Sequence, residues 1–276
     1  MNNHFKVRPT YLLPILASLV FGVFCSFLIL TSPLEVYRVT PFPEGYLSLF
    51  NALYFIILVG VGATIIYFLL RRRSRKIVNV IVCFALTTAV FLLSMIYLSA
   101  AFSKFALAFT HARLLIPIFS FLITIFVDIT IFKIQGIISD IIVLFLGGGL
   151  GAFLGVSIPT LSTILILLFL AAYDAFAVYQ GVVGKIASLG LEQLRGLSFS
   201  FREIQIGLGD LTFYSMLCGH MLFNFDLIPC LTSMAGILFG CFLAFKMLER
   251  KGIFPGLPLP IIFGLAAGFL PFLFGF

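Results

Sequence analysis

Apolar residues form nine long stretches along the chain, and charged residues or prolines separate each stretch from the next. Most stretches approach or exceed about 20 residues, the length that a helix needs to cross the hydrocarbon core of a membrane. Because an open strand in lipid leaves its backbone groups unpaired, we predict that every span is a helix and that no strand is present. The predicted spans are 10–31, 46–70, 77–100, 114–132, 137–156, 160–183, 204–224, 228–246 and 258–276.

The composition agrees with a membrane protein. Hydrophobic residues make up 62% of the chain and charged residues only 10%, whereas about a quarter of the residues in soluble domains are charged. The net charge of +7 would suit a nucleic-acid partner, but the basic residues lie at the ends of apolar stretches, which argues against one. We therefore predict an all-α polytopic protein integral to the cell membrane, with the lipid bilayer as its surroundings.

The basic residues predict how the chain is oriented. Five of the six residues in the connection Arg71–Lys76 are basic, and basic connections are typical of the cytoplasmic side. Placing this connection inside also brings fourteen of the 17 Lys and Arg residues inside, and leaves only Arg38, Lys104 and Arg113 outside. This asymmetry predicts a cytoplasmic N-terminus and an external C-terminus.

The nine spans are expected to form one membrane domain. Residues 1–183 contain the first six spans, residues 184–203 form a short cytoplasmic loop, and residues 204–276 contain the last three spans. Gly147, Gly151 and Gly155 recur every four residues on the fifth span, which predicts close packing against another helix.

Two acidic residues, Asp174 and Asp210, lie well inside apolar stretches. A carboxylate in the membrane is costly, so each is a functional candidate. Asp174 precedes Lys185 by eleven residues and Asp210 follows Arg202 by eight, which places them roughly 16 and 12 Å from the cytoplasmic side at the rise of an α-helix. Since spans six and seven run in opposite directions, the two carboxyls are expected at a similar depth.

Small residues surround both aspartates. Four alanines lie within three positions of Asp174, Gly207 lies three residues before Asp210, and Gly209 lies beside it. Small residues allow membrane helices to approach closely. Tyr214, four residues after Asp210, is expected on the same helix face, where it could donate a hydrogen bond to the site.

Two adjacent carboxyls can hydrolyse a peptide bond. Because both cannot ionise cheaply at a separation of a few ångströms, the pair shares one proton. The ionised carboxyl takes a proton from water, which attacks the peptide carbonyl, while the protonated carboxyl polarises that carbonyl and then protonates the leaving nitrogen. The proton belongs to the pair, because the two groups titrate as a unit.

Three motifs resemble those of the presenilin and signal peptide peptidase family of intramembrane aspartyl proteases. Tyr173-Asp174 resembles its YD motif, and Gly207-Leu208-Gly209-Asp210 resembles its GxGD motif. Pro255-Gly256-Leu257-Pro258 resembles its PAL motif, with Gly256 in place of Ala. The motifs occur in order on spans six and seven and before span nine, and the short chain looks most like the archaeal members.

The resemblance implies that Asp174 and Asp210 are catalytic and that transmembrane helices of other proteins are the substrates. It also implies that the segment from Pro255 to Pro258 (Pro255, Gly256, Leu257 and Pro258) lies near the aspartates and helps to hold the extended substrate. Prolines disfavour a regular helix there and leave backbone groups available for pairing. The residues expected to support the site are Tyr173, Gly207, Gly209 and Tyr214.

Other functions remain open from the residues alone. The same aspartates would suit a proton-coupled secondary transporter, or a structural pair in a non-catalytic scaffold. The sequence contains neither HExxH nor Gly-x-Ser-x-Gly, so zinc and serine protease chemistry are disfavoured, and we expect no metal and no cofactor. The sequence leaves a homo-oligomer open and shows no obligatory partner subunit.

Overall fold

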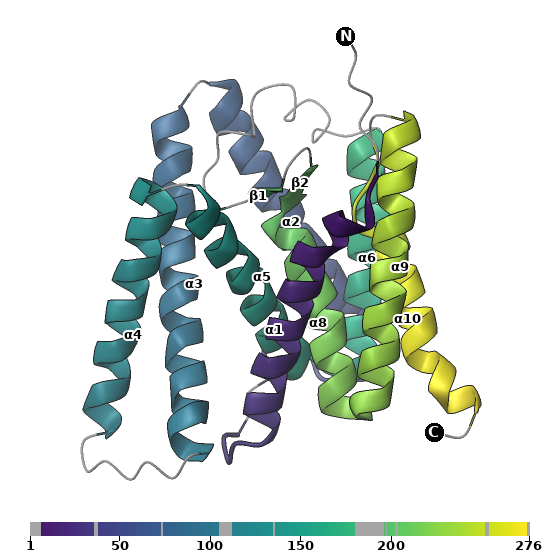
Figure 1. The fold of residues 1–276 in the computed structure, drawn as a ribbon, viewed down its shortest axis with the longest axis horizontal. Helices are drawn as coiled ribbons and strands as arrows, with labels where there is room; N and C mark the ends of the chain where they lie inside the picture. Colours follow the sequence, from purple (N-terminus) through teal and green to yellow (C-terminus); the bar gives the residue numbers. More distant parts are fainter. Residues whose placement is uncertain are drawn as a thin grey trace.

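The computed structural model describes residues 7–35, 38–72, 74–104, 112–134, 136–179, 196, 198–201, 204–251 and 254–274. Within these ranges a helix lies at each of the nine predicted positions (Figure 1). The helices are α1 (Leu13–Leu30, preceded by the 3-10 turn Pro9–Leu12), α2 (Ser48–Arg71), α3 (Arg75–Lys104), α4 (Ala112–Ile129, continued by the π-helical turn Thr130–Ile134), α5 (Ile137–Ser157), α6 (Thr160–Tyr179), α8 (Leu208–Phe225), α9 (Leu227–Lys251) and α10 (Pro258–Leu273).

The outer helices present apolar surface on the scale that a membrane requires. Seven helices, α1 to α6 and α9, are long and apolar enough to cross a bilayer. Their outward faces carry large hydrophobic side chains, such as Phe84 at 74% exposed and Leu114 at 66% exposed. Apolar surface this extensive suits lipid rather than water. The chain is therefore an integral, multi-pass membrane protein built mainly of helices.

The orientation of the termini stays a prediction. Several of the basic residues on which it depends lie outside the described residues: Lys6, Arg73, Lys185, Arg195 and Arg202. Residues 180–195 of the predicted sixth span and the loop that follows it also lie outside them.

Helix α8 lies at the centre of the bundle, where it contacts α1, α5, α6, α9 and α10 (Figure 1). Most of its side chains are buried, including Leu211, Met216 and Leu217. Because its neighbours separate it from lipid, α8 can carry polar residues such as Ser215 and His220, both fully buried. Because of these polar residues, α8 is not among the seven helices that are apolar enough to cross a bilayer. Helix α10 is not among them because it has only 16 residues.

The glycine repeat of α5 packs directly against α8, as predicted. A Cβ atom added to Gly151 would collide with the backbone oxygen of Thr212, and one added to Gly155 would collide with that of Met216. Neither obstacle is a flexible side chain, so neither can move aside without shifting a helix. The repeat therefore sets the distance between α5 and the helix that carries Asp210.

Gly151→Ala is expected to destabilise the bundle. Overpacking of a close contact costs about 1–3 kcal/mol, and the temperature of unfolding in detergent should fall accordingly. Gly62→Ala is the matched control, because Gly62 is also inside a helix but has open space around its Cβ position. If both variants unfold at the wild-type temperature, the close contact between α5 and α8 is not important for stability.

A short hairpin precedes α8, and it corrects two predictions. Strand β1 (Ser198–Phe201) pairs antiparallel with β2 (Ile204–Gly207). The expectations that no strand is present and that the seventh helix begins at residue 204 are therefore wrong. The strands pair with each other, which satisfies backbone groups that an isolated strand would leave open. The alternation of Ser with Phe and of Ile with Gln has the period of a strand, and Phe199 and Ile206 are buried.

Candidate active site

The two aspartates come from α6 and α8, near the end of the first helix and at the start of the second. Asp174 lies five residues before the end of α6 at Tyr179. Asp210 is the third residue of α8, where the positive end of the helix dipole favours a carboxylate. Gly207, the last residue of β2, is also the N-cap of α8 and has an extended conformation. The hairpin therefore determines where α8 begins and places Asp210 in its first turn.

One backbone segment, Phe254–Leu257, lies against both carboxyls. The Leu257 N–H donates a hydrogen bond of 3.0 Å to Asp174 Oδ2. A Cβ atom added to Gly256 would lie 2.8 Å from Asp210 Oδ2. Because Gly256 and Leu257 are adjacent, the two carboxyls both lie beside the same peptide unit. The structure thus brings together Asp174, Asp210 and the proline-rich segment before α10.

These contacts show which part of the proline-rich segment lies at the aspartates. Gly256 and Leu257 contact the carboxyls, and Pro255 lines a small cavity beside Asp210. Pro258 is instead the first residue of α10, where its missing N–H has no cost because the first helical N–H groups have no intrahelical partner. As expected, this stretch is not helical, since residues 254–257 lie between α9 and α10.

Tyr214 holds this segment from α8. Its hydroxyl donates a hydrogen bond of 2.9 Å to the Gly256 carbonyl, and its side chain is 3% exposed. The tyrosine lies one turn after Asp210, on the face expected from its spacing. The tyrosine thus contacts the backbone segment that presents the Leu257 N–H to Asp174, and its role in supporting the site stays a prediction.

If the aspartate pair cleaves peptides, as the sequence predicts, Tyr214→Phe should reduce turnover about tenfold without unfolding the protein. The change leaves the Gly256 carbonyl without its partner, at a cost of about 1–3 kcal/mol for a buried polar group. Single-turnover and steady-state cleavage of a transmembrane peptide would measure the effect. Tyr54→Phe is a suitable control, because Tyr54 is 46% exposed on α2. A Tyr214→Phe enzyme with wild-type turnover would show that this hydrogen bond does not position the segment.

A cavity of about 120 Å³ lies beside Asp210 and contains residues that sequence reasoning missed. Apart from Asp210, Tyr214, Pro255 and Gly256, its lining comes from α1, the hairpin, α9 and Phe254. These additional residues are Ile15, Gln205, Ile206, Cys241, Ala244, Phe245, Leu248 and Phe254. Ile206 and Phe254 directly precede the motifs at Gly207 and Pro255. Most of the eight are ordinary apolar residues, however, so no chemical signal distinguishes them from the remaining core.

The other residues expected to support the site lie at different distances from it. A Cβ atom added to Gly207 would lie 3.7 Å from Asp210 Oδ2, so this glycine is next to the carboxyl. Gly209 is exposed and lies near the ring of Phe213. The Tyr173 hydroxyl lies 3.9 Å from the Cβ position of Gly60, and so packs toward α2. The roles of these three residues stay predictions.

Comparison with known proteins identifies the fold. No family model matches the sequence, and no curated protein matches it. Solved structures of a presenilin family intramembrane aspartate protease do match. A C222 crystal form gives a TM-score of 0.69 at 20% identity and covers 95% of this chain and 99% of that chain. A P2 crystal form gives 0.66 at 21% identity and covers 94% and 96%. Along nearly its whole length, the chain has the fold of the presenilin-family intramembrane aspartate proteases.

Proposed function

We propose that the protein is an intramembrane aspartic endopeptidase that hydrolyses peptide bonds within the transmembrane segments of other proteins. The observation that carries the proposal is the pair of carboxyls, Asp174 and Asp210, which both lie beside one non-helical backbone segment inside an apolar bundle. The likeness in fold to intramembrane aspartate proteases supports it. No comparable observation favours a transporter or a scaffold.

In this proposal the two aspartates share one proton and activate water. The ionised carboxyl removes a proton as the water oxygen attacks the substrate carbonyl carbon, and the protonated carboxyl donates a hydrogen bond to the carbonyl oxygen. As the tetrahedral intermediate collapses, the C–N bond breaks and a carboxyl proton is transferred to the leaving nitrogen. The Leu257 N–H keeps Asp174 oriented through this sequence.

The segment before α10 would also receive the substrate backbone. A transmembrane helix satisfies its own backbone hydrogen bonds, so its scissile bond is accessible only after local unwinding. Residues 254–257 are not helical, and they lie against both aspartates. Tyr214 and Asp174 already occupy the Gly256 carbonyl and the Leu257 N–H. Extended substrate could pair with the backbone at Phe254 and Pro255 in the manner of an added strand.

The proposed topology has nine crossings, with the N-terminus in the cytoplasm and the C-terminus outside. In this arrangement α8 and α10 cross the membrane as well, although neither has the length and apolarity of the other seven helices. Contacts of both helices with α6 and α9 support this topology.

Peptide hydrolysis in isotopically labelled water tests the function. Purified protein is incubated with a labelled transmembrane peptide in H₂¹⁸O, and mass spectrometry identifies the products. We expect two fragments cut within the apolar stretch, with one ¹⁸O atom in the newly formed carboxyl group. Intact peptides across a panel of transmembrane sequences, together with proton-dependent solute flux in liposomes, would instead favour the transporter.

The cleavage rate should follow a bell-shaped pH profile with its maximum at mildly acidic to neutral pH. Activity requires one proton on the pair, so it falls at low pH, when both carboxyls are protonated, and at high pH, when both are ionised. Initial rates across the range with a fixed peptide would show both limbs. A rate that continued to rise to strongly alkaline pH would exclude a shared proton.

A further inference from the structure

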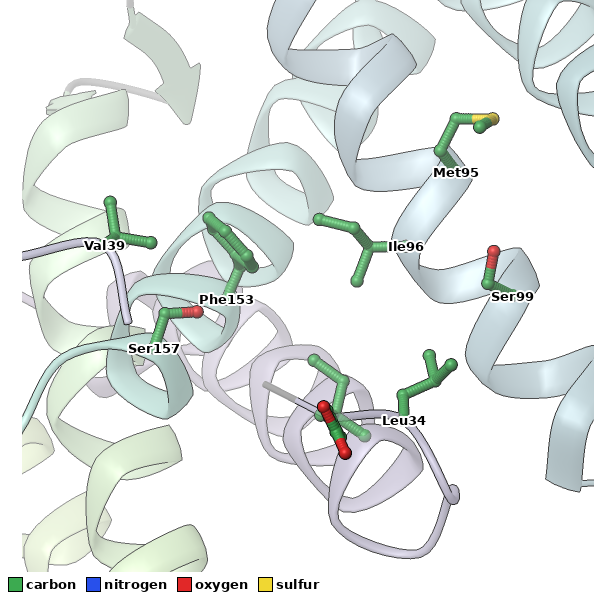
Figure 2. A pocket seen from close by; sticks show the side chains of 9 residues that line it. Leu34, Val39, Met95, Ile96, Ser99, Phe153 and Ser157 are labelled. Atoms are coloured by element: carbon green, nitrogen blue, oxygen red, sulfur yellow. The ribbon is translucent and has the colours of Figure 1, made fainter. Parts of the chain in front are cut away.

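Two cavities adjoin at the end of the bundle opposite the aspartates. The first, of about 390 Å³, lies between the end of α1, α3 and α5 (Figure 2). The second, of about 350 Å³, lies around the turn between α5 and α6 and shares Leu34 and Ser157 with the first. Thr160, on the lining of the second cavity, precedes Asp174 by 14 residues of α6, or roughly 21 Å at the rise of an α-helix. Neither cavity is therefore part of the aspartate site.

The two cavities differ in chemistry. The first is lined mainly by apolar side chains, and Figure 2 shows Phe153 of α5 and Ile96 of α3 on opposite sides of it. The second contains Arg38, Glu44 and Asn224. The polar groups of the first cavity are few: the hydroxyls of Ser99 and Ser157 and the carboxylate of Glu35, which is an exposed residue. A ligand occupying both cavities would therefore have a mainly apolar part and a charged part.

Ser157 lies where the two cavities meet and lacks a hydrogen-bond partner. Its side chain is 2% exposed, and its Oγ forms no hydrogen bond with any of the residues that the structure describes. Figure 2 shows this oxygen directed into the first cavity. A buried hydroxyl without a partner is unfavourable. Four other buried serines also lack a partner among the described residues, but of the five only Ser157 lines these two cavities. A polar group of a ligand at this junction would satisfy it.

The second cavity contains one charge of each sign. Glu44 is held in place because its Oε1 accepts a hydrogen bond of 3.0 Å from the Leu161 N–H. Arg38 also lines the cavity, and within the described part of the chain these two residues form no ion pair with each other. A guanidinium suits a phosphate group, and a carboxylate suits an ammonium group. The cavity therefore complements a zwitterion better than an anion.

We propose that the joined cavities bind one zwitterionic phospholipid of the phosphoethanolamine class. An acyl chain occupies the apolar cavity, the polar glycerol ester region lies at Ser157, the phosphate contacts Arg38 and the amine contacts Glu44. The exposed apolar faces of α1 and α3 suit contact with bilayer lipid, so a lipid ligand could enter the first cavity directly from the membrane. The bound lipid would connect α1, α3 and α5 to the turn before α6, independently of any peptidase activity.

Native mass spectrometry of delipidated protein tests the proposal. The protein in mild detergent is titrated with dioleoyl phosphatidylethanolamine and, separately, with the anionic dioleoyl phosphatidylglycerol. Ser99→Phe fills the apolar cavity from α3, and its control is Ser103→Phe, an exposed position one turn further along the same helix. Arg38→Gln removes the proposed phosphate contact, and its control is Arg72→Gln, which is exposed at the end of α2.

Wild-type protein is expected to bind the ethanolamine lipid about tenfold more tightly than the glycerol lipid, and each test variant to weaken that binding about tenfold, the scale of one charge-assisted contact. Both control variants should bind as the wild type does. Equal affinity for the two lipids, or wild-type affinity in Arg38→Gln, would overturn the proposal. Because Arg38 is exposed, that variant tests the proposal even if Ser99→Phe disturbs folding, which its unfolding temperature would show.

Discussion

Asparagine in place of either Asp174 or Asp210 is expected to abolish cleavage of a transmembrane peptide. An amide has nearly the shape of a carboxyl but cannot take up or release the shared proton. Loss of general acid–base catalysis costs about 10²–10⁴-fold in rate. Here the loss affects two steps, because the carboxyl pair both activates the attacking water and protonates the leaving nitrogen. The double variant should be no slower than either single variant, because the two groups act as a unit.

The measurement is the initial rate of peptide cleavage by each purified variant, with its unfolding temperature as the test of folding. Asp226→Asn is the matched control. Asp226 is exposed at the other end of α8, and its Oδ1 accepts a hydrogen bond of 2.7 Å from the Leu227 N–H, which the amide oxygen of asparagine can also accept. The control should cleave at the wild-type rate. Near-wild-type turnover in Asp174→Asn or Asp210→Asn would refute the two-aspartate mechanism.

Valine in place of Gly256 is expected to slow cleavage about 10²-fold, the scale of a misplacement of about 1 Å at a reacting group. The Cβ atom of the valine would lie 2.8 Å from Asp210 Oδ2 and 3.2 Å from Asp210 Cγ. Valine adds two methyl groups beyond its Cβ atom, so the Asp210 carboxyl must move away from its position beside residue 256. The effect should appear in kcat, because the aspartate is displaced even when substrate is bound.

Gly256→Ala separates displacement of Asp210 from loss of backbone freedom. Its single methyl meets the end of a rotatable side chain rather than fixed backbone, so we expect a smaller loss than for valine. In the PAL motif that this segment resembles, alanine is the residue at the position of Gly256. Gly62→Val is the control, since nothing lies within 4 Å of its Cβ position. Wild-type kcat in Gly256→Val would show that this segment does not contact Asp210 during catalysis.

The hairpin before α8 shows where a correct physical rule led to a wrong expectation. The cost of unpaired backbone in lipid excludes a lone strand, but β1 and β2 pair with each other. The alternating residues of Ile204–Gly207 carry a strand signal, yet four residues are too few to outweigh the apolar run that follows. Only the paired partner, Ser198–Phe201, distinguishes a strand from a helical turn here.

The glycine repeat and the proline-rich segment show two levels of predictability. Gly151 and Gly155 were identified as a packing face by their spacing alone, because helical periodicity is a local property. Their partner, α8, was not identified. For Pro255–Pro258 the resemblance indicated proximity to the aspartates, but not that Gly256 and Leu257 would make the contacts while Pro258 begins a helix.

By itself, the sequence determined that the chain is a membrane protein, approximately where its nine helices lie, and which two aspartates are functional candidates. Each follows from a local quantity: the length of an apolar run, or the cost of a charge within one. Tertiary structure alone decided that Tyr214 anchors Gly256 and that the Leu257 N–H reaches Asp174. These contacts join residues 42 and 83 positions apart, so they depend on how the helices pack in three dimensions, which no local pattern encodes.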